Sequence, residues 1–389
     1  MKKVFVFMVA AAMIAGCVMP AMATDKEVSF YGNVRMDTFW IDRDAKTNSM
    51  LTRDWGGSSV GWCGPGAATS GLYDETDVWW DLCQGCSRFG AKFKAGDVAA
   101  NVEIRPNSNS YYRQWWGSWN FGAGTLVVGQ TWSPTWHGIS NSVYDGGDAA
   151  AYGEAGGSLR TPQVAVHFPF EVGTLKISFA EPGTDAVAGN LGIAAADFDT
   201  ESLIPKVEAS FDGKIGMVDF AVFGGYNSLE ARDASTDDTM DIDGYYGGMM
   251  VHVPIGPAYF KGDVWMAQNP YEYGLFLPGN PFAAKAYGNS IEDVEALGYM
   301  ALVGMKFTDM LAFEAGYGYT KIERDNPTYG TEDEDDKAFY YIQMPITLAK
   351  GVTVTPEIGK FDEKEHVVDG VTVDDGDAFY YGAYWRIDF

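Results

Sequence analysis

The chain alternates apolar and polar side chains over many short runs, most clearly in its last twelve residues, "AFYYGAYWRIDF". Every second position back from the terminus carries a large apolar side chain or alanine: Phe389, Ile387, Trp385, Ala383, Tyr381 and Phe379. A period of two is typical of a β-strand with one face in an apolar medium and the other in a polar one. A soluble sandwich and a barrel in lipid both produce this pattern.

Sixteen such runs follow one another along the sequence. Short turns such as Gly96-Asp97 join some of them, and long connections such as residues 133–159 separate others. An even number of strands with seven short turns and eight long connections is typical of a closed up-and-down membrane barrel. Both ends of the series fall on the short-turn side, so the first and last strands can pair and leave no open edge.

The alternation also assigns faces to the strands. In the run at residues 87–96, Phe89 and Phe93 share one face, whereas Arg88 and Lys92 occupy the other. A packed soluble core does not accommodate unpaired cations, but a water-filled lumen does. We therefore expect an all-β fold: a closed antiparallel transmembrane barrel of 16 strands, with short turns at one end and long external loops at the other.

The N-terminus predicts export from the cytoplasm. Lys2 and Lys3 precede an apolar stretch, and Ala21-Met22-Ala23 is a small-residue cleavage site. These features predict a signal peptide at residues 1–23, followed by a single barrel domain at residues 24–389. The alternative is lipidation of Cys17, which ends the lipoprotein-like "IAGC". No later stretch reaches the roughly 18 apolar residues that a spanning helix needs.

The charge of the chain excludes one class of partner. The formal net charge is −26, and removal of the two signal-peptide lysines makes it −28. Nucleic acid needs a basic surface, so it is excluded as a partner. Residues 230–243, 323–337 and 362–377 hold 20 acidic and 4 basic groups. We interpret them as external loops that concentrate cations, bridge divalent ions to lipid headgroups, or simply stay solvated.

Cysteine and histidine give little sign of a reactive centre. Cys63, Cys83 and Cys86 remain after cleavage, and no histidine follows Cys86, so haem attachment is not supported. We predict a disulfide between Cys63 and either Cys83 or Cys86, because the compartment is oxidising. The four histidines are scattered, and no nucleophile motif is visible. We expect no metal, no cofactor and no enzymatic activity.

With these features the chain resembles the Gram-negative general porins, a family of trimeric sixteen-stranded outer-membrane barrels. The resemblance rests on the signal peptide, the first run "VSFYGNVRMDTFW", the long third external connection after "LVVGQTWSP", and the terminal "YWRIDF". The segments "SRFG", "WNFGAGTL" and "GQTWSP" are similar to porins of sulfur- and metal-reducing bacteria. In this family Phe389 would be read by the barrel-assembly machinery as an assembly signal.

The resemblance also implies a constriction. The family's third external loop folds into the pore, and the matching segment is Ser133–Leu159. Its acidic residues would face a basic wall on the first strands, and Arg113 is not assigned to either face. The residues implied are Asp145, Asp148 and Glu154 on the loop, and Arg35, Arg88, Lys92 and Arg105 on the wall.

The function implied is passive diffusion of ions and small hydrophilic solutes across the outer membrane, with a mild preference for cations. The partners implied are outer-membrane lipid, the assembly machinery and two further copies in a homotrimer. A substrate-selective channel is the first alternative, and an outer-membrane barrel enzyme is the second.

Overall fold

A computed structural model describes most of the chain beyond the predicted signal peptide. The described residues are 26–45, 73–82, 86–105, 112–144, 152–156, 160–183, 190–194, 197–202, 204–275, 283–287 and 290–389. The predicted signal peptide and Cys17 lie outside these residues, so both stay predictions. None of the described helices is long and apolar enough to cross a membrane.

The described residues form one large antiparallel sheet and one small hairpin. The strands of the large sheet are β1 (Lys26–Ala45), β2 (Tyr73–Leu82), β3 (Arg88–Ala95), β4 (Val98–Ile104), β5 (Tyr112–Asn120), β6 (Thr125–Trp132), β7 (Arg160–Phe170), β8 (Gly173–Ala180), β9 (Phe198–Glu201), β10 (Lys206–Ile215), β11 (Val218–Asp233), β12 (Asp238–Ile255), β13 (Ala258–Gln268), β16 (Val294–Lys306), β17 (Ala312–Asn326), β18 (Thr331–Gln343), β19 (Ile346–Ala349), β20 (Val352–Val368) and β21 (Val371–Asp388). The hairpin is β14 (Lys285–Tyr287) with β15 (Ser290–Glu292), and the helix within the described residues is the short α2 (Pro270–Tyr273).

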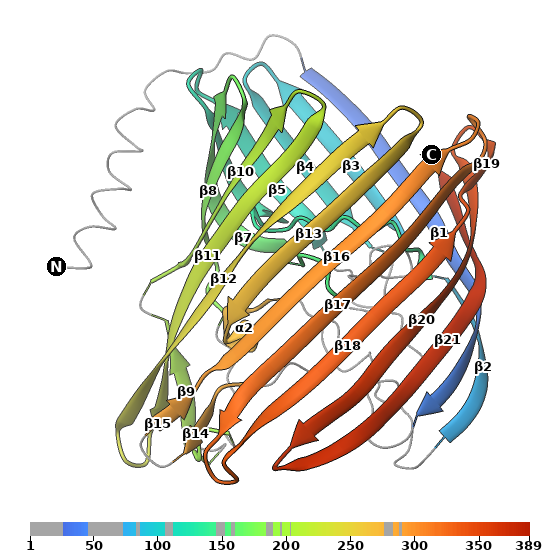
Figure 1. Ribbon diagram of the computed structural model, residues 1–389. Helices are drawn as coiled ribbons and strands as arrows, with labels where there is room; N and C mark the ends of the chain where they lie inside the picture. The colour runs from blue at the N-terminus through green and yellow to red at the C-terminus, as the bar shows by residue number, and fades with distance from the viewer. Residues whose placement is uncertain are drawn as a thin grey trace.

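The large sheet closes into the predicted barrel (Figure 1). β2 with β3, β9 with β10, and β18 with β19 each share one position, so the described strands occupy sixteen positions. Closure comes from β1 and β21, which pair from Asn33 with Asp388 to Ala45 with Gly376. Two backbone hydrogen bonds between Gly32 and Phe389 extend this seam to the last residue.

The second strand position is interrupted, which the alternation did not predict. β2 pairs with the second half of β1 and β3 with its first half, and Cys86 and Ser87 precede β3. The Arg35 N–H lies at the break and donates to the Ser87 hydroxyl (2.9 Å) in place of a strand carbonyl. A side chain therefore satisfies the backbone group that the interrupted ladder leaves open.

The two faces of the wall match the predicted alternation. Phe379, Tyr381, Trp385, Ile387 and Phe389 are exposed on the outside of the barrel, whereas Tyr380 and Tyr384 are buried within it. On β16 the alternation is equally regular over the whole strand. A continuous apolar outer face is what a barrel needs in lipid.

Three of the eight external connections are short, which corrects the expectation of long loops at those places. The acidic segments 230–243, 323–337 and 362–377 extend six long strands and meet in tight turns at residues 234–237, 327–330 and 369–370. Figure 1 shows these three hairpins reaching furthest at the end opposite the short turns. The period-two signal vanishes there because both strand faces carry charged groups.

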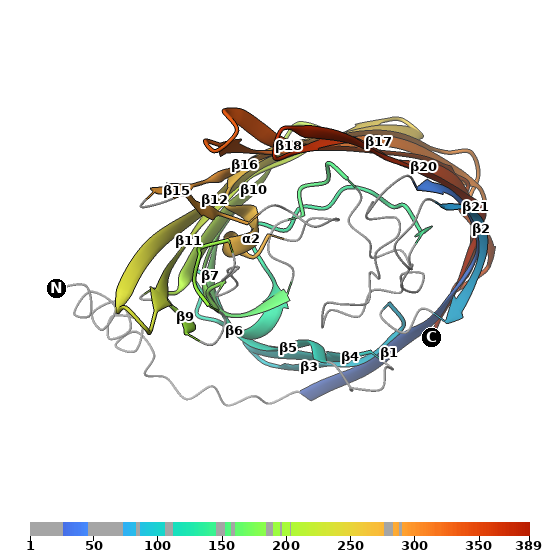
Figure 2. The same ribbon diagram turned by 90° about the horizontal axis from the view of Figure 1, so that it is seen from below.

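The lumen is partly filled by inserted chain. Figure 2 shows the connection after β6 crossing the interior of the barrel, and α2 lying inside its wall. Residues of this connection belong to the largest buried apolar cluster among the described residues, together with residues of β1, β16, β18 and β21. The described part of this connection, residues 133–144 and 152–156, is called the inserted loop below.

Candidate pore constriction

The inserted loop is held against one side of the barrel by buried carboxylates. Glu357 on β20 accepts hydrogen bonds from the Ser142 hydroxyl (2.8 Å) and from the N–H groups of Val143 (2.8 Å) and Tyr144 (3.2 Å). The Tyr380 hydroxyl donates to it as well (2.7 Å). A carboxylate with four donors is well satisfied although it is buried, so it fixes this stretch of the loop.

Glu314 on β17 binds the neighbouring residue of the loop, Asn141, in the same way. It accepts from the N–H (3.1 Å) and side-chain amide (2.5 Å) of Asn141. Three wall side chains complete its shell: the hydroxyls of Tyr259 and Tyr341, both at 2.5 Å, and the amide of Gln343 at 3.1 Å. Gln343 also donates to the Asn141 carbonyl (2.8 Å), so Asn141 is bound from both sides.

The far end of the loop touches the wall directly. The Gly153 N–H donates to the Thr320 hydroxyl (2.7 Å), and the Trp265 indole N–H donates to the Gly153 carbonyl (3.0 Å). A Cβ at position 318 would lie 1.8 Å from the Tyr152 carbonyl oxygen. Glycine at 318 therefore allows this approach, because any side chain would push the loop away from β17.

Aromatic packing supplies the apolar part of the attachment. Tyr144 stacks on Tyr380 with ring centroids 4.2 Å apart and meets Phe39 edge-on at 5.3 Å. Tyr152 packs on Phe361, and its hydroxyl donates to Glu363. Hydrogen bonds and aromatic contacts together hold the loop on strands β13 to β21.

The predicted basic wall lies on strands β1, β3 and β4, which are neighbours. Arg113 of β5 joins it: its Nε lies 2.9 Å from a Glu103 carboxylate oxygen, and Arg88 lies 3.8 Å from the same oxygen. The Tyr31 hydroxyl donates to the other oxygen of Glu103 (3.0 Å). One buried carboxylate therefore offsets part of the charge of two arginines.

The remaining predicted basic residues lie around this group. The Arg35 Nε donates to the Asn33 side-chain oxygen (3.0 Å). The Lys92 ammonium lies 5.2 Å from the centre of the Tyr31 ring, and Arg105 is buried directly after β4. Arg113, which sequence left unassigned, faces the lumen because a bulge between β4 and β5 shifts the pairing beside it.

The acidic residues predicted for the loop divide into two groups. Asp145 and Asp148 lie outside the described residues, so their place at the constriction stays a prediction. Glu154 is buried and accepts a hydrogen bond from the Ser140 N–H (2.5 Å). The next residue, Ala155, donates its N–H to Asp263 on β13 (3.1 Å). Glu154 thus braces one part of the loop against another.

Sequence reasoning missed the carboxylates that hold the loop: Glu314, Glu357, Glu363 and Asp263. A usable signal was present for Glu314, Glu357 and Asp263, because each is an acidic residue at a lumen-facing position in a largely apolar or aromatic run, as in "LAFEAGYGYT" and "VTVTPEIGKF", whereas Glu363 lies in the charged run "DEKEH". The missing information was the partner, since nothing in a strand sequence tells which loop will reach it.

Cys86 is disulfide-bonded. Cys63 and Cys83 lie outside the described residues, so the choice of partner stays a prediction. The position of Cys86 beside Ser87 places the bond at the break between β2 and β3.

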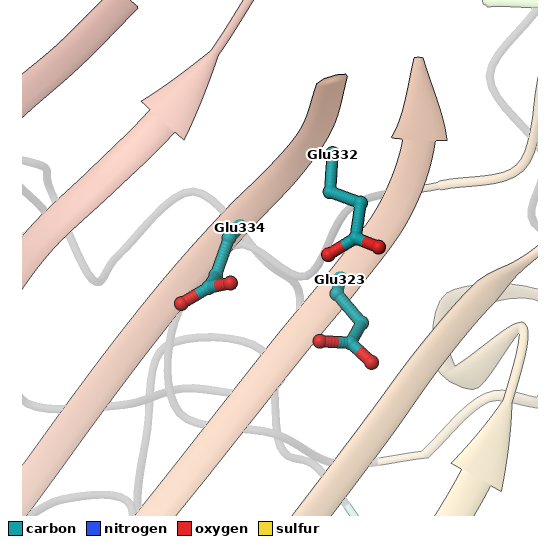
Figure 3. Close-up of side chains that lie close together, drawn as sticks. All are labelled: Glu323, Glu332 and Glu334. Carbon is teal, nitrogen blue, oxygen red and sulfur yellow. The ribbon is translucent and has the colours of Figure 1, made fainter. Parts of the chain in front are cut away.

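A carboxylate cluster lies on the outer face of the β17–β18 hairpin (Figure 3). Glu323, Glu332 and Glu334 each bring one oxygen within 4.8 Å of the others. The Lys321 ammonium lies 2.7 Å from Glu323 and 3.1 Å from Glu334, so an internal cation already offsets part of the charge. The cluster faces away from the lumen, and we do not assign a metal to it.

A polar cavity of about 460 Å³ lies in the lumen between the inserted loop and the short-turn end. Its lining includes Asn141 from the loop, Tyr259 and Glu314 from the wall, and Arg386 and Asp388 near the C-terminus. A passage for a hydrophilic solute needs such a wet, polar lining.

Comparisons with known proteins agree with this geometry. The family model for Gram-negative porins matches residues 9–366, so the chain belongs to that family. It is an outer-membrane channel for small solutes. A search of curated protein sequences finds no match.

Solved structures with the same fold cover nearly the whole chain. The outer membrane channel DcaP of Acinetobacter baumannii matches with a TM-score of 0.67 and 17% identity, over 95% of this chain and 100% of that one. OmpT of Vibrio cholerae matches with a TM-score of 0.57 and 17% identity, over 95% and 100%. An anion-selective porin from Comamonas acidovorans matches with a TM-score of 0.57 and 12% identity, over 94% and 100%. At these identities the matches show the fold alone.

Proposed function

We propose that the chain is a general diffusion porin with no enzymatic activity, in which the inserted loop narrows the water-filled lumen. The observation that supports this most strongly is the attachment of the loop at Glu314 and Glu357. These residues fix it between the wall of β13–β21 and the basic wall of β1–β5. A solute then passes between fixed groups of both signs, which is how charged rings in channels select ions.

The homotrimer predicted from the family resemblance is part of this proposal. OmpT of Vibrio cholerae has been solved in a trimer form, and it shares the fold. Native mass spectrometry in detergent tests the assembly directly. A trimer is expected, and a monomer under conditions that preserve the folded barrel would contradict it.

We propose a modest preference for cations. The overall charge is strongly acidic, and the acidic hairpins at residues 230–243, 323–337 and 362–377 lie around the external end. On the basic wall, Glu103 offsets part of the charge of Arg88 and Arg113. Asp145 and Asp148 are the loop carboxylates that we expect nearest the passage, and Arg35, Lys92 and Arg105 oppose them.

A substrate-selective channel is the competing function, and the polar cavity beside Arg386 is the place where a selective site would lie. The two functions differ in saturation. A diffusion pore passes small sugars and amino acids at rates that fall smoothly with size, whereas a selective channel saturates with one solute. Liposome swelling with a graded set of neutral and charged solutes separates them, and saturation by one solute class would overturn the general-porin proposal.

Planar-bilayer recording tests the constriction. Joint replacement of Asp145→Asn and Asp148→Asn should move the reversal potential towards anions even at high salt, because charges at the narrowest zone are poorly screened. Glu154→Gln keeps an oxygen that can accept the Ser140 N–H, so its effect should be smaller. An unchanged reversal potential in the double variant would show that these residues do not line the passage.

A further inference from the structure

A second external connection enters the barrel, and the family resemblance did not lead us to expect it. α2 follows β13 and is tied to the inside of the wall at both ends. The Asn269 amide donates to the Asp243 carbonyl (2.9 Å), and the Asn227 amide donates to the Glu272 carbonyl (2.9 Å). Tyr273, the last residue of α2, is fully buried.

Tyr273 reaches across the lumen face of β11 to a carboxylate on β10. Its hydroxyl donates to Glu208 (3.0 Å), and the Lys206 ammonium donates to its carbonyl (3.3 Å). Gly225 of β11 lies opposite Glu208 of β10, and a Cβ at position 225 would be 2.1 Å from the Tyr273 hydroxyl oxygen. A glycine at this position therefore leaves the space through which the tyrosine reaches its acceptor.

Glu208 also holds the first residues of the inserted loop. Its second oxygen accepts from the Ser133 hydroxyl (2.7 Å), and its first oxygen also accepts from the Thr135 hydroxyl (3.3 Å). The two hydroxyls lie 2.8 Å apart. All of these side chains are buried. We call Ser133, Thr135, Glu208 and Tyr273 the Glu208 junction.

We propose that Tyr273 and Glu208 are positioning residues of the channel. Through the Glu208 junction, α2 fixes the root of the inserted loop and thereby sets the width of the passage. The inference rests on the proposed function, because it needs the loop to be the constriction. Glu314 and Glu357 hold the middle of the loop, whereas the junction holds the point where it leaves β6.

The chemistry explains why the two connections are coupled. A buried carboxylate must keep its donors, because an unmet acceptor inside the barrel is costly. If the tyrosine hydroxyl is lost, the Lys206 ammonium, which lies 4.0 Å from a Glu208 oxygen, can replace it as a donor. Moving its ammonium towards Glu208 weakens its bond to the Tyr273 carbonyl. Because Ser133 and Thr135 bind the same carboxylate, a change in α2 that alters Glu208 also alters their hydrogen bonds.

Single-channel recording of the full-length porin in planar bilayers, with polyethylene glycols of graded size added, tests this inference. Tyr273→Phe removes one hydroxyl from the junction. Tyr226→Phe is the matched control, because the Tyr226 hydroxyl also donates to a carboxylate (Asp243, 2.7 Å) but on the outer face of β11. We expect Tyr273→Phe to change the occupancy of partly closed current levels by about fivefold, the effect of one net hydrogen bond.

We also expect Tyr273→Phe to move the polymer size at which the current is no longer reduced, while Tyr226→Phe leaves both values unchanged. Ser133→Ala removes another donor to Glu208, this time from the inserted loop. The effects of Tyr273→Phe and Ser133→Ala should be non-additive in the double variant. If Tyr273→Phe does not assemble, the single variant Ser133→Ala tests the junction, and wild-type values in it overturn the inference. Wild-type values in both single variants, or full additivity, would overturn the coupling.

The recordings also distinguish this inference from the proposed function. If Asp145→Asn with Asp148→Asn alters selectivity but the junction variants do not differ from wild type, the loop is the constriction and only its coupling to α2 is wrong. If the wild-type protein forms no pore, the proposed function fails whatever the junction variants do.

Discussion

The two sides of the barrel use their charged residues in opposite ways. On the side of β13–β21, carboxylates accept hydrogen bonds from the inserted loop, and this binding uses much of their hydrogen-bonding capacity. On the side of β1–β5, two arginines, Arg88 and Arg113, lie beside the carboxylate of Glu103. The first side therefore decides where the loop lies, and the second supplies much of the charge that it faces. A count of charges along the sequence does not distinguish these roles.

The height of the wall also varies around the barrel. The strands from β3 to β8 have 7 to 11 residues, whereas β11, β12, β17, β20 and β21 have 15 to 18. At ~3.3 Å per residue, the longer strands extend well beyond the roughly 9–11 residues that a tilted strand needs to cross a bilayer. The extra length carries the acidic hairpins, so much of the external negative charge lies over the part of the mouth that β11 to β21 form.

The largest effect should come from the seam that joins the two sides. Phe389→Asp, or deletion of Phe389, should abolish most assembly, because it removes the aromatic end of β21 where it bonds to Gly32. Phe307→Asp is the control, since Phe307 is also an exposed phenylalanine at the short-turn end. Heat-modifiable mobility on gels measures the folded barrel. Normal yields of the Phe389 variant would refute the assembly role.

The next largest effect should follow removal of a loop anchor. Glu357→Ala leaves two loop N–H groups and two hydroxyls without their acceptor, at about 1–3 kcal/mol for each buried donor that stays unpaired. The loop should detach, with higher and noisier single-channel conductance. Glu332→Ala, which removes an exposed carboxylate on the outer face, should not change the current. If Glu357→Ala shows the same conductance and low noise as the wild type, the remaining contacts of the loop suffice to hold it without Glu357.

The α2 connection should respond to pH. Burial, with Asp293 nearby, raises the pKa of Glu272 from its ordinary value of 4.5 to about 7, and Arg324 and the Ala284 N–H only partly oppose this rise. A raised pKa means that its stabilising effect is complete below about 4.5 and is lost as the pH rises through about 7.

Hydrogen exchange of residues 269–275, corrected for intrinsic rates, should therefore show about tenfold more frequent opening at pH 8 than at pH 6. Glu272→Gln should remove this difference. An equal pH dependence in the two proteins would show that Glu272 is not the group that titrates.

The basic side should affect selectivity without loosening the loop. Glu103→Gln removes a negative charge beside Arg88 and Arg113, so the permeability ratio should move towards anions. A unit charge at about 8 Å in water corresponds to about 0.5 kcal/mol, or a factor of about two. Arg88→Gln should move the ratio the other way. Reversal potentials measure both, and shifts of the same sign would contradict the assignment of this wall to the passage.

The smallest effect should come from the acidic hairpins. Replacing Glu323, Glu332 and Glu334 by glutamine should lower cation preference at low salt only, because charges beyond about 10 Å are screened at ~0.1 M. These groups also lie on the outer face. An equal loss of preference at high salt would mean that they lie much closer to the passage than the hairpin geometry places them.

The sequence was sufficient to predict the barrel but not the internal contacts. Alternation fixed the faces of β16 and β21, since lipid on one side and water on the other impose a period of two on every membrane-crossing strand. The extended strands at residues 323–337 are not predicted by the alternation, because charged groups occupy both of their faces.

The loop anchors were harder to predict for a different reason. Glu314 and Glu357 look like ordinary lumen residues until Asn141 and Val143 are brought to them, across more than 170 residues of sequence. Likewise, nothing in "NPYEYG" indicates that α2 lies inside the barrel. Glu208 connects α2 with the inserted loop, but only the fold brings these three segments together.

The reversal potential of the wild-type channel across a salt gradient, measured at low and at high mean salt, tests the central claim most directly. We predict a modest cation preference that weakens at high salt but does not vanish, because the hairpin charges are screened and the constriction charges are not. A preference for anions under both conditions would contradict it, since the arginines of the β1–β5 wall would then outweigh the acidic groups.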